Sequence, residues 1–403
     1  MSATAPTLVG RLSSTDPRRG ERALVGLAWA ALFLNVLTFS ARPILLPVPQ
    51  PVGQLVTQGA LPLALVLALL ANRRIVVRPQ LFLALLSLLA VVALMTSLHN
   101  EFLAGSVFRS IRMLGVCLVL WVLTPWWGRR DMLLLRCHRA CLWFVLVVVG
   151  VGALVAPNMA FAFEGRLAGT LWPIPPTQAA HYGGVLFGTT VILWMCRRQS
   201  GRAALLALAA SGAVLVATHT RTAILGVVIG CVLATATLFL GHVRVRRASV
   251  WGAAVLVVVS AVFASQLTTW AMRGQSASEA AELTGRTKVW SAVVEAPRSS
   301  FELLFGSGLS DQSFDGLPID SNWVATYLDQ GWFGVVVQVL VLLVLLLAAA
   351  TRERGPERAI ALFLIVYCIV ASITETGLMV PSAYLLDLAV AAALLARPVR
   401  GLA

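Results

Sequence analysis

The sequence predicts an all-α fold: a polytopic membrane helical bundle of about twelve transmembrane helices, with one large extracytoplasmic loop before the tenth helix. Three observations lead to this fold class: the composition, the spacing of apolar runs and the placement of arginines. Of the 403 residues, 59% are hydrophobic and only 12% are charged. Soluble domains carry about 25% charged residues, so an ordinary soluble fold is excluded.

Apolar runs long enough to cross a hydrocarbon core, about 17 to 25 residues, recur along the whole chain. They predict a single integral membrane domain over residues 1–403. We expect helices at 23–40, 56–71, 80–98, 108–126, 140–156, 178–196, 203–218, 222–241, 249–266, 323–350, 358–374 and 379–396. Four arginines precede the first run and no small-residue cleavage site follows it, which indicates a retained signal anchor.

Basic residues gather in alternate connecting segments. The chain has 31 Lys and Arg against 17 Asp and Glu, a formal charge of +14. Most of these cations fall in seven segments, namely the N-terminal tail (1–22), 73–78, 129–139, 197–202, 244–247, 352–358 and the C-terminal tail (397–403). Under the positive-inside rule all seven are cytoplasmic, which requires twelve crossings of the cytoplasmic membrane with both termini inside. Nucleic acid is not an expected partner, because the basic loops are short and lack interleaved aromatic residues.

The six cysteines fall inside the predicted spans or at their cytoplasmic ends. No disulfide framework follows from this distribution. Cys137 and Cys141 are four residues apart without a second pair nearby, so they are interpreted as small apolar residues, and no metal site is predicted.

The longest predicted outer loop covers residues 267–322, and a loop of that length usually has a function. Its apolar residues Val289, Trp290, Val293 and Val294 fall on a helical stripe between Arg286 and Ala296. A short amphipathic helix is therefore expected, with Thr284 as a possible N-cap and Pro297 as the stop. The following LFGSGLS reads as a turn kinked at its glycines.

Three shorter outer elements also carry polar residues. They are FEGRLAGTLWPIPPTQAAHYGG with Arg166 and His181, THTRT with His219 and Arg221, and SITETGLMVPS with Glu375. A charge at the bilayer centre costs about 2.5 to 3.5 kcal/mol, so such residues generally face a polar cavity. A lone Arg221 could instead snorkel to lipid headgroups. His181 and His219 fit hydrogen-bonded helix ends better than they fit bases. With Arg166, Arg286 and Glu375 on the same side, a shared cavity is the better interpretation.

Arginines in an outward-facing membrane cavity suggest a lipid diphosphate as ligand, because guanidinium groups bind phosphate oxygens in a bidentate fashion. A sugar on that diphosphate has a good leaving group that needs charge neutralisation, while the attacking hydroxyl needs a general base. The carboxylates available are Asp311, Asp315, Asp320 and Glu375. Such a transfer requires neither ATP, nor a metal, nor another cofactor.

Several motifs in this order resemble the O-antigen ligase and O-antigen polymerase superfamily. They are GRLAGTLWP (165–173), THTRTAILG (218–226), TGRTKVW (284–290) with LLFGSGLS (303–310), DSNWVATYLDQGWFG (320–334) and ITETGLMVPS (373–382). The resemblance covers residues 165 to the C-terminus. It implies an inverting, metal-independent glycosyltransferase that uses an undecaprenyl-diphosphate-linked oligosaccharide outside the cytoplasmic membrane. The implied acceptor is a hydroxyl of a glycan or glycolipid, and the implied partners include a flippase and a chain-length regulator.

The resemblance also assigns roles to individual residues. It implies that Arg221 and Arg286 hold the donor diphosphate, with Arg166 as a further candidate for the same role. Asp320 stands where the ligases have His, ahead of Gly331 and Gly334 at the family's spacing. This departure favours a polysaccharide polymerase, with a carboxylate as base, over a ligase that acts on a lipid or cell-wall acceptor. The candidate catalytic residues are therefore Asp320 and Glu375.

Alternatives to these roles stay open at the level of the sequence. Asp320 could only cap the tenth helix, and Glu375 could only pair with an arginine across the cavity. From another functional class, a membrane transporter or a flippase for lipid-linked glycans would also place charges inside a helical bundle. Internal repeats or paired broken helices would mark such a protein, and the sequence shows neither. A scaffold protein of a polysaccharide assembly complex is the third possibility.

Overall fold

The computed structural model describes residues 17–39, 44–45, 47–98, 103–239, 243–272 and 286–397. It is mostly helical, at 74%. Each of the twelve predicted ranges overlaps a helix. These helices are α1 (Pro17–Val36), α2 (Gln50–Ala71), α3 (Leu81–Ser97), α4 (Leu103–Val122), α5 (Leu133–Val155), α7 (Pro176–Met195), α8 (Gly201–Ala217), α9 (Arg221–Leu238), α10 (Val243–Val262), α15 (Asn322–Thr351), α16 (Pro356–Ala371) and α17 (Ala383–Leu395).

Five of these helices are long and apolar enough to cross a membrane by length and composition: α2, α4, α5, α9 and α15. Their mean hydropathy over eighteen residues lies between 1.7 and 2.9. Large apolar side chains point outward from the bundle, including Phe144, Leu154 and Leu205, each at least 70% exposed. A soluble protein rarely exposes so much apolar surface, so the molecule is an all-α membrane protein. The full count of twelve crossings stays a prediction.

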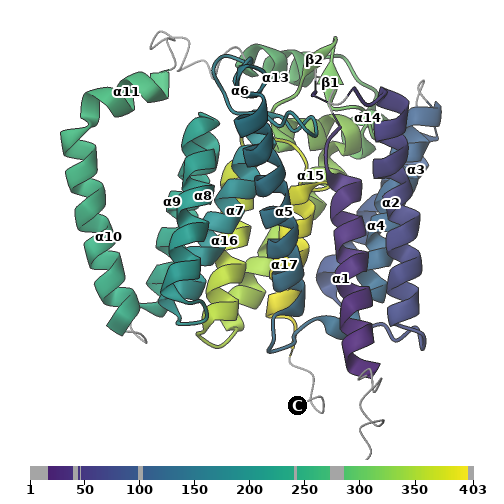
Figure 1. Cartoon of the computed structure of the whole chain (residues 1–403). Helices are drawn as coiled ribbons and strands as arrows, with labels where there is room; N and C mark the ends of the chain where they lie inside the picture. The colour runs from purple at the N-terminus through teal and green to yellow at the C-terminus, as the bar shows by residue number, and fades with distance from the viewer. Residues whose placement is uncertain are drawn as a thin grey trace, which may run out of the picture.

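The helices stand side by side in one bundle (Figure 1). Helix α1 packs against α2, α3 against α4, α7 against α8, and α16 against both α9 and α17. Helix α17 is the centre of this arrangement, since every residue from Ala383 to Leu395 is buried. Helix α10 stands at the edge of the bundle, with Trp251 and Val255 exposed.

The short elements gather at one end of the bundle, drawn at the top of Figure 1. They include α6 (Pro157–Ala160), α11 (Ala264–Met272), α13 (Arg286–Glu295), α14 (Ser300–Phe305), β1 (Ser313–Phe314) and β2 (Leu317–Pro318). A 3-10 turn, η1 (Thr124–Trp126), follows α4 at the other end of the bundle. Helix α13 confirms the helix expected from Arg286, whereas its expected cap Thr284 lies outside the described residues. The predicted loop at 267–322 begins inside α11, so its first residues are helical.

Helix α15 is kinked at Gly331, whose φ of 62° and ψ of −164° are not helical. A Cβ at Gly331 would lie 2.5 Å from the carbonyl oxygen of Leu304, and one at Gly306 would lie 2.2 Å from the backbone nitrogen of Gln330. Both positions also have positive φ, which glycine adopts without strain. The two glycines therefore let the end of α14 pack directly on the kink. This packing fixes the first part of α15, which follows Asp320.

Candidate functional site

The candidate site lies at the end of the bundle where the short elements gather, and Arg166 is its first component. Phe163 and Arg166 form a β-bridge around a tight turn in which Glu164 and Gly165 both have positive φ. The turn presents the Arg166 guanidinium to the connection between α8 and α9. Its Nε donates to the carbonyl of Thr218 at 3.0 Å, and Nη2 donates to the hydroxyl of Thr220 at 3.3 Å.

The second component is an ion pair between Arg286 and Asp320. Arg286 Nε donates to Asp320 Oδ2 at 3.0 Å, and the two side chains are 29% and 39% exposed. A small apolar cluster of Val293, Ile319 and Ala325 holds α13 against the beginning of α15. The pair is therefore positioned by packing and remains accessible to a ligand.

The alternative that Asp320 only caps the tenth helix is wrong. Helix α15 begins at Asn322, its N-cap is Ser321, and no side chain makes the cap hydrogen bond. The Asp320 carboxylate is one residue too early to reach the free N–H groups of the first turn, and it binds Arg286 instead.

The third component is Glu375, in the loop between α16 and α17. Burial raises the pKa of this carboxyl to about 7, Arg286 and Arg166 oppose the shift, and Asp320 adds to it. All three charges are therefore close enough to act on Glu375. A carboxyl with a pKa near 7 can accept and release a proton close to neutral pH.

Arg221 is the first residue of α9, at the junction of these components. Its neighbour Thr220 accepts from Arg166, and its neighbour Thr222 lies 2.7 Å from the hydroxyl of Thr374, the residue before Glu375. The backbone of Arg221 thus lies between the Arg166 turn and the Glu375 loop, and its Nε is buried. Arg166, Arg286, Asp320 and Glu375 are brought into one neighbourhood, with the first turn of α9 beside them.

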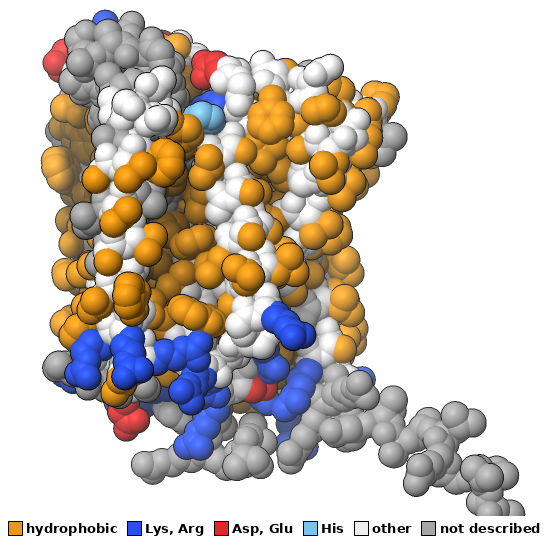
Figure 2. Space-filling model, turned by 60° about the vertical axis from the view of Figure 1, so that its left-hand side comes forward, with side chains coloured by type: hydrophobic (Ala, Val, Ile, Leu, Met, Phe, Trp, Pro, Cys, Tyr) orange, Lys and Arg blue, Asp and Glu red, His pale blue; other side chains and the backbone are white. Residues whose placement is uncertain are grey.

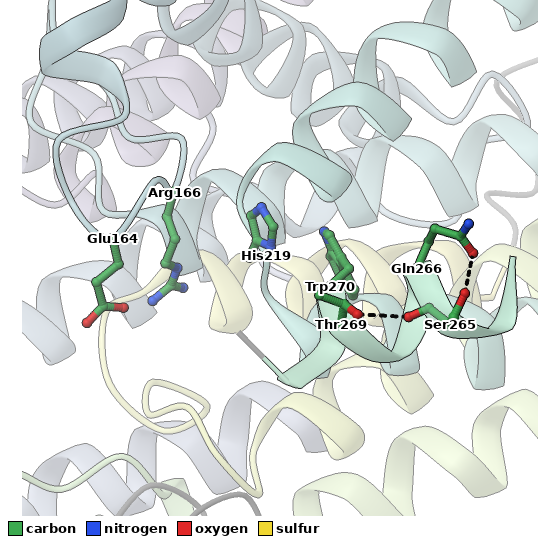
Figure 3. A pocket seen from close by; sticks show the side chains of 7 residues that line it. All are labelled: Glu164, Arg166, His219, Ser265, Gln266, Thr269 and Trp270. Atoms are coloured by element: carbon green, nitrogen blue, oxygen red, sulfur yellow. Dashed lines mark hydrogen bonds between the residues drawn. The ribbon is translucent and has the colours of Figure 1, made fainter. Parts of the chain in front are cut away.

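A cavity of about 900 Å³ opens beside Arg166. Its lining is Glu164, Arg166, His219, Ser265, Gln266, Thr269 and Trp270. Figure 3 shows Arg166 and Glu164 on one wall and α11 on the other, with His219 between them. The rings of His219 and Trp270 stack with centroids 5.2 Å apart. The space suits a polar ligand with a flat apolar face, such as a sugar.

Asp311 and Asp315 are the other two candidate carboxylates of the long loop. Asp311 accepts from the hydroxyl of Ser313 at 2.6 Å, and this hydrogen bond lowers its pKa. Asp315 lies in the turn between β1 and β2 with φ of 49°. Neither is among the charges that act on Glu375.

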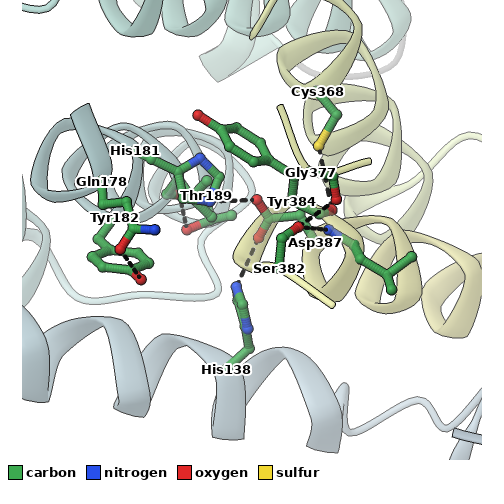
Figure 4. Close-up of polar contacts among 12 residues, drawn as sticks. His138, Gln178, His181, Tyr182, Thr189, Cys368, Gly377, Ser382, Tyr384 and Asp387 are labelled. Atoms are coloured by element: carbon green, nitrogen blue, oxygen red, sulfur yellow. Dashed lines mark hydrogen bonds and ion pairs between the residues drawn. The ribbon is translucent and has the colours of Figure 1, made fainter. Parts of the chain in front are cut away.

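A second group of ionisable residues is buried among the helices (Figure 4). Asp387 of α17 lies between two imidazoles, with Oδ1 2.8 Å from His138 Nε2 and Oδ2 3.1 Å from His181 Nε2. All three side chains are at most 1% exposed. The sequence favours a helix-end role for His181 over a role as base, and it points to neither His138 nor Asp387. An Asp inside the apolar run 379–396 was the available signal, because intramembrane carboxylates are rare and paired.

No known family model matches this chain, and a search of curated proteins finds none with significant similarity.

Proposed function

We propose that the chain is a membrane glycosyltransferase of the O-antigen ligase and polymerase type, crossing the cytoplasmic membrane twelve times with its site outside. It would transfer an undecaprenyl-diphosphate-linked glycan to a sugar hydroxyl, and the proposal leans to a polysaccharide polymerase. One observation carries it: two arginines and two carboxylates from separate loops share one neighbourhood, and one of the arginines, Arg166, lines a large open cavity. The motifs that resemble the superfamily supply the reaction class.

In this proposal Arg286 and Arg166 bind the donor diphosphate, assisted by Arg221. Asp320 holds the Arg286 guanidinium in place before the donor arrives, at 3.0 Å. Neutralising the diphosphate matters most as the sugar–phosphate bond breaks, because the polyprenyl diphosphate then leaves with its full charge.

Glu375 is the proposed general base, since its pKa of about 7 suits proton transfer near neutral pH. The acceptor hydroxyl oxygen attacks the anomeric carbon while its proton passes to the Glu375 carboxylate. The bond from the anomeric carbon to the diphosphate oxygen breaks, and its electron pair leaves with the diphosphate. Attack opposite the leaving group inverts the anomeric centre.

The test uses a strain lacking this gene, complemented with variants, and measures polymer amount and chain length. Arg286→Ala should reduce polymer by about 100-fold, as expected for loss of a group that stabilises developing charge. Lys288→Ala is the matched control, because Lys288 is an exposed cation on the same helix. Wild-type polymer with Arg286→Ala, at normal protein abundance, would contradict the proposal.

A polysaccharide or O-antigen ligase is the alternative within the same class. It shares the donor site and differs in the acceptor. The strain lacking this gene distinguishes the two functions. If long chains are lost while single repeat units stay attached to the acceptor, the protein is a polymerase. If all attached glycan is lost, it is a ligase.

A transporter or flippase for lipid-linked glycans remains the candidate from another class. The buried His138–Asp387–His181 group favours it, because proton-coupled transporters use such residues, and the kink at Gly331 gives one broken helix. Purified protein in liposomes distinguishes the two. Translocation of a lipid-linked glycan without glycan transfer would support the transporter.

A further inference from the structure

The opposite end of the bundle carries a second cavity, of about 550 Å³, between α5 and the end of α7. Four arginines line it: Arg130, Arg136, Arg139 and Arg198. Figure 2 shows how Lys and Arg side chains gather along this lower rim, below a broad belt of apolar side chains. The cavity therefore lies where a lipid headgroup meets the apolar region of a membrane.

The charge of this cavity is strongly positive. Its only carboxylate among the described lining residues is Asp131, which accepts from Nε and Nη2 of Arg129, both at 3.3 Å. Arg136 lies 3.3 Å from the same carboxylate. Because Arg129 already compensates Asp131, the cations that face the cavity are in excess, and an anion is the complementary ligand.

Arg139 is held in place from two sides. Its Nη2 donates to the hydroxyl of Thr190 at 3.0 Å and to the side-chain oxygen of Gln199 at 2.8 Å. The side chain is half-buried, whereas Arg130, Arg136 and Arg198 are exposed. One guanidinium is thus preorganised at the inner wall and three stand at the mouth, an arrangement that suits a phosphate group.

An apolar groove continues from this cavity, and Trp143 lines both. The groove, about 320 Å³, runs between α5 and α8 towards Phe161 and Leu167. Small residues keep it open, namely Gly150, Ala153, Ala210, Ala213 and Ala217. A Cβ at Gly150 would meet nothing within 4 Å. From Trp143 to Ala153 the helix rises about 15 Å, which accommodates most of one acyl chain.

We propose that this is a binding site for a phospholipid with an anionic headgroup. The headgroup phosphate lies among the four arginines, and one acyl chain lies in the groove between α5 and α8. The positive charge of the cavity favours an anionic headgroup. Because the apolar groove continues from the basic cavity, a lipid fits the site better than a soluble anion does.

Native mass spectrometry of the full-length protein tests the proposal, after exchange into nanodiscs of equal phosphatidylglycerol and phosphatidylcholine. The wild type should retain phosphatidylglycerol in preference to phosphatidylcholine. The double variant Arg130→Gln/Arg198→Gln should lower that preference by about 30-fold, because each arginine near a phosphate contributes roughly 1 kcal/mol and the two contributions add. Arg202→Gln, an exposed cation at the same end outside the cavity, should leave it unchanged.

A second variant tests the groove without altering charge. Gly150→Phe faces open space, so the fold should tolerate it, and it should also lower phosphatidylglycerol retention by filling the groove. Equal retention of the two lipids by the wild type, or full retention by Gly150→Phe, would overturn the proposal. Thermal stabilisation by inorganic phosphate as large as that by phosphatidylglycerol would also overturn it, since a soluble anion would then be the ligand.

Discussion

The carboxylates of Asp320 and Asp387 both pair with nitrogen-bearing side chains, and the two sites differ in burial. Asp320 pairs with Arg286 among the short elements, where both side chains are about one-third exposed. Asp387 pairs with His138 and His181 inside the bundle, where all three are at most 1% exposed. The chemistry is similar, but only the first pair can exchange its partner for a ligand.

Because the two groups differ in burial, we expect the loss of one to lower stability and the loss of the other to lower function. Breaking a buried ion pair by removing one partner costs about 3 to 5 kcal/mol, whereas an exposed pair contributes about 0 to 1 kcal/mol. The Asp387 group connects α5, α7 and α17, so its loss should act on folding. The Asp320 pair joins α13 to the start of α15 and is partly exposed, so its loss should act on ligand binding and turnover.

The largest expected effect is on turnover. Glu375→Gln removes the proposed base but keeps the shape of the side chain, so polymer synthesis should fall by 100-fold or more. The measurement is polymer formed per amount of membrane protein. Glu295→Gln is the control, since Glu295 is an exposed carboxylate at the end of α13. Unchanged synthesis by Glu375→Gln would remove Glu375 from the mechanism.

The next effect is on stability. Asp387→Ala should lower the free energy of unfolding by about 3 kcal/mol, because it leaves the buried His138 without its acceptor and the buried His181 without the neighbouring carboxylate. Asp320→Ala should change it by less than about 1 kcal/mol. Unfolding in mixed detergent micelles measures both. Should Asp387→Ala not accumulate, Asp387→Asn gives the milder comparison, and equal stability of the Asp387 and Asp320 variants would contradict the distinction drawn above.

A smaller effect is expected in the pH profile. Glu375 has a pKa of about 7 and acts as a base when deprotonated, so the rate should rise with pH through a midpoint near pH 7 and level off roughly one unit above it. Asp320→Asn removes a negative charge that raises this pKa, so the midpoint should move to lower pH. Initial rates between pH 5 and 9 provide the test. A profile that falls with rising pH in this range would assign Glu375 a role as acid.

Much of the fold could be predicted from the sequence, because apolar runs and their arginine-rich breaks are local signals. The short helix at Arg286 was equally local, since its apolar stripe has helical spacing. The Asp387 group was not, because His138 and Asp387 are 249 positions apart and nothing local marks their contact. The kink at Gly331 could not be predicted from local sequence either, because it depends on packing against α14.

The candidate site was predicted in part. The sequence named Arg166, Arg286, Asp320 and Glu375 and expected their loops to share a cavity. Of these four residues, Arg166 lines the cavity beside α11. The pairing of Arg286 with Asp320 could not be predicted, because Asp320 also fits the pattern of a helix cap. The contribution of α11 to the cavity wall was missed as well, because residues 267–272 were assigned to a loop.

The most direct test of the central claim is donor binding. Undecaprenyl diphosphate should bind the wild-type protein in nanodiscs, and Arg286→Ala should weaken binding by about tenfold or more through loss of a charge-assisted contact. Lys288→Ala should bind like the wild type. Equal affinity of all three proteins for undecaprenyl diphosphate would contradict the account.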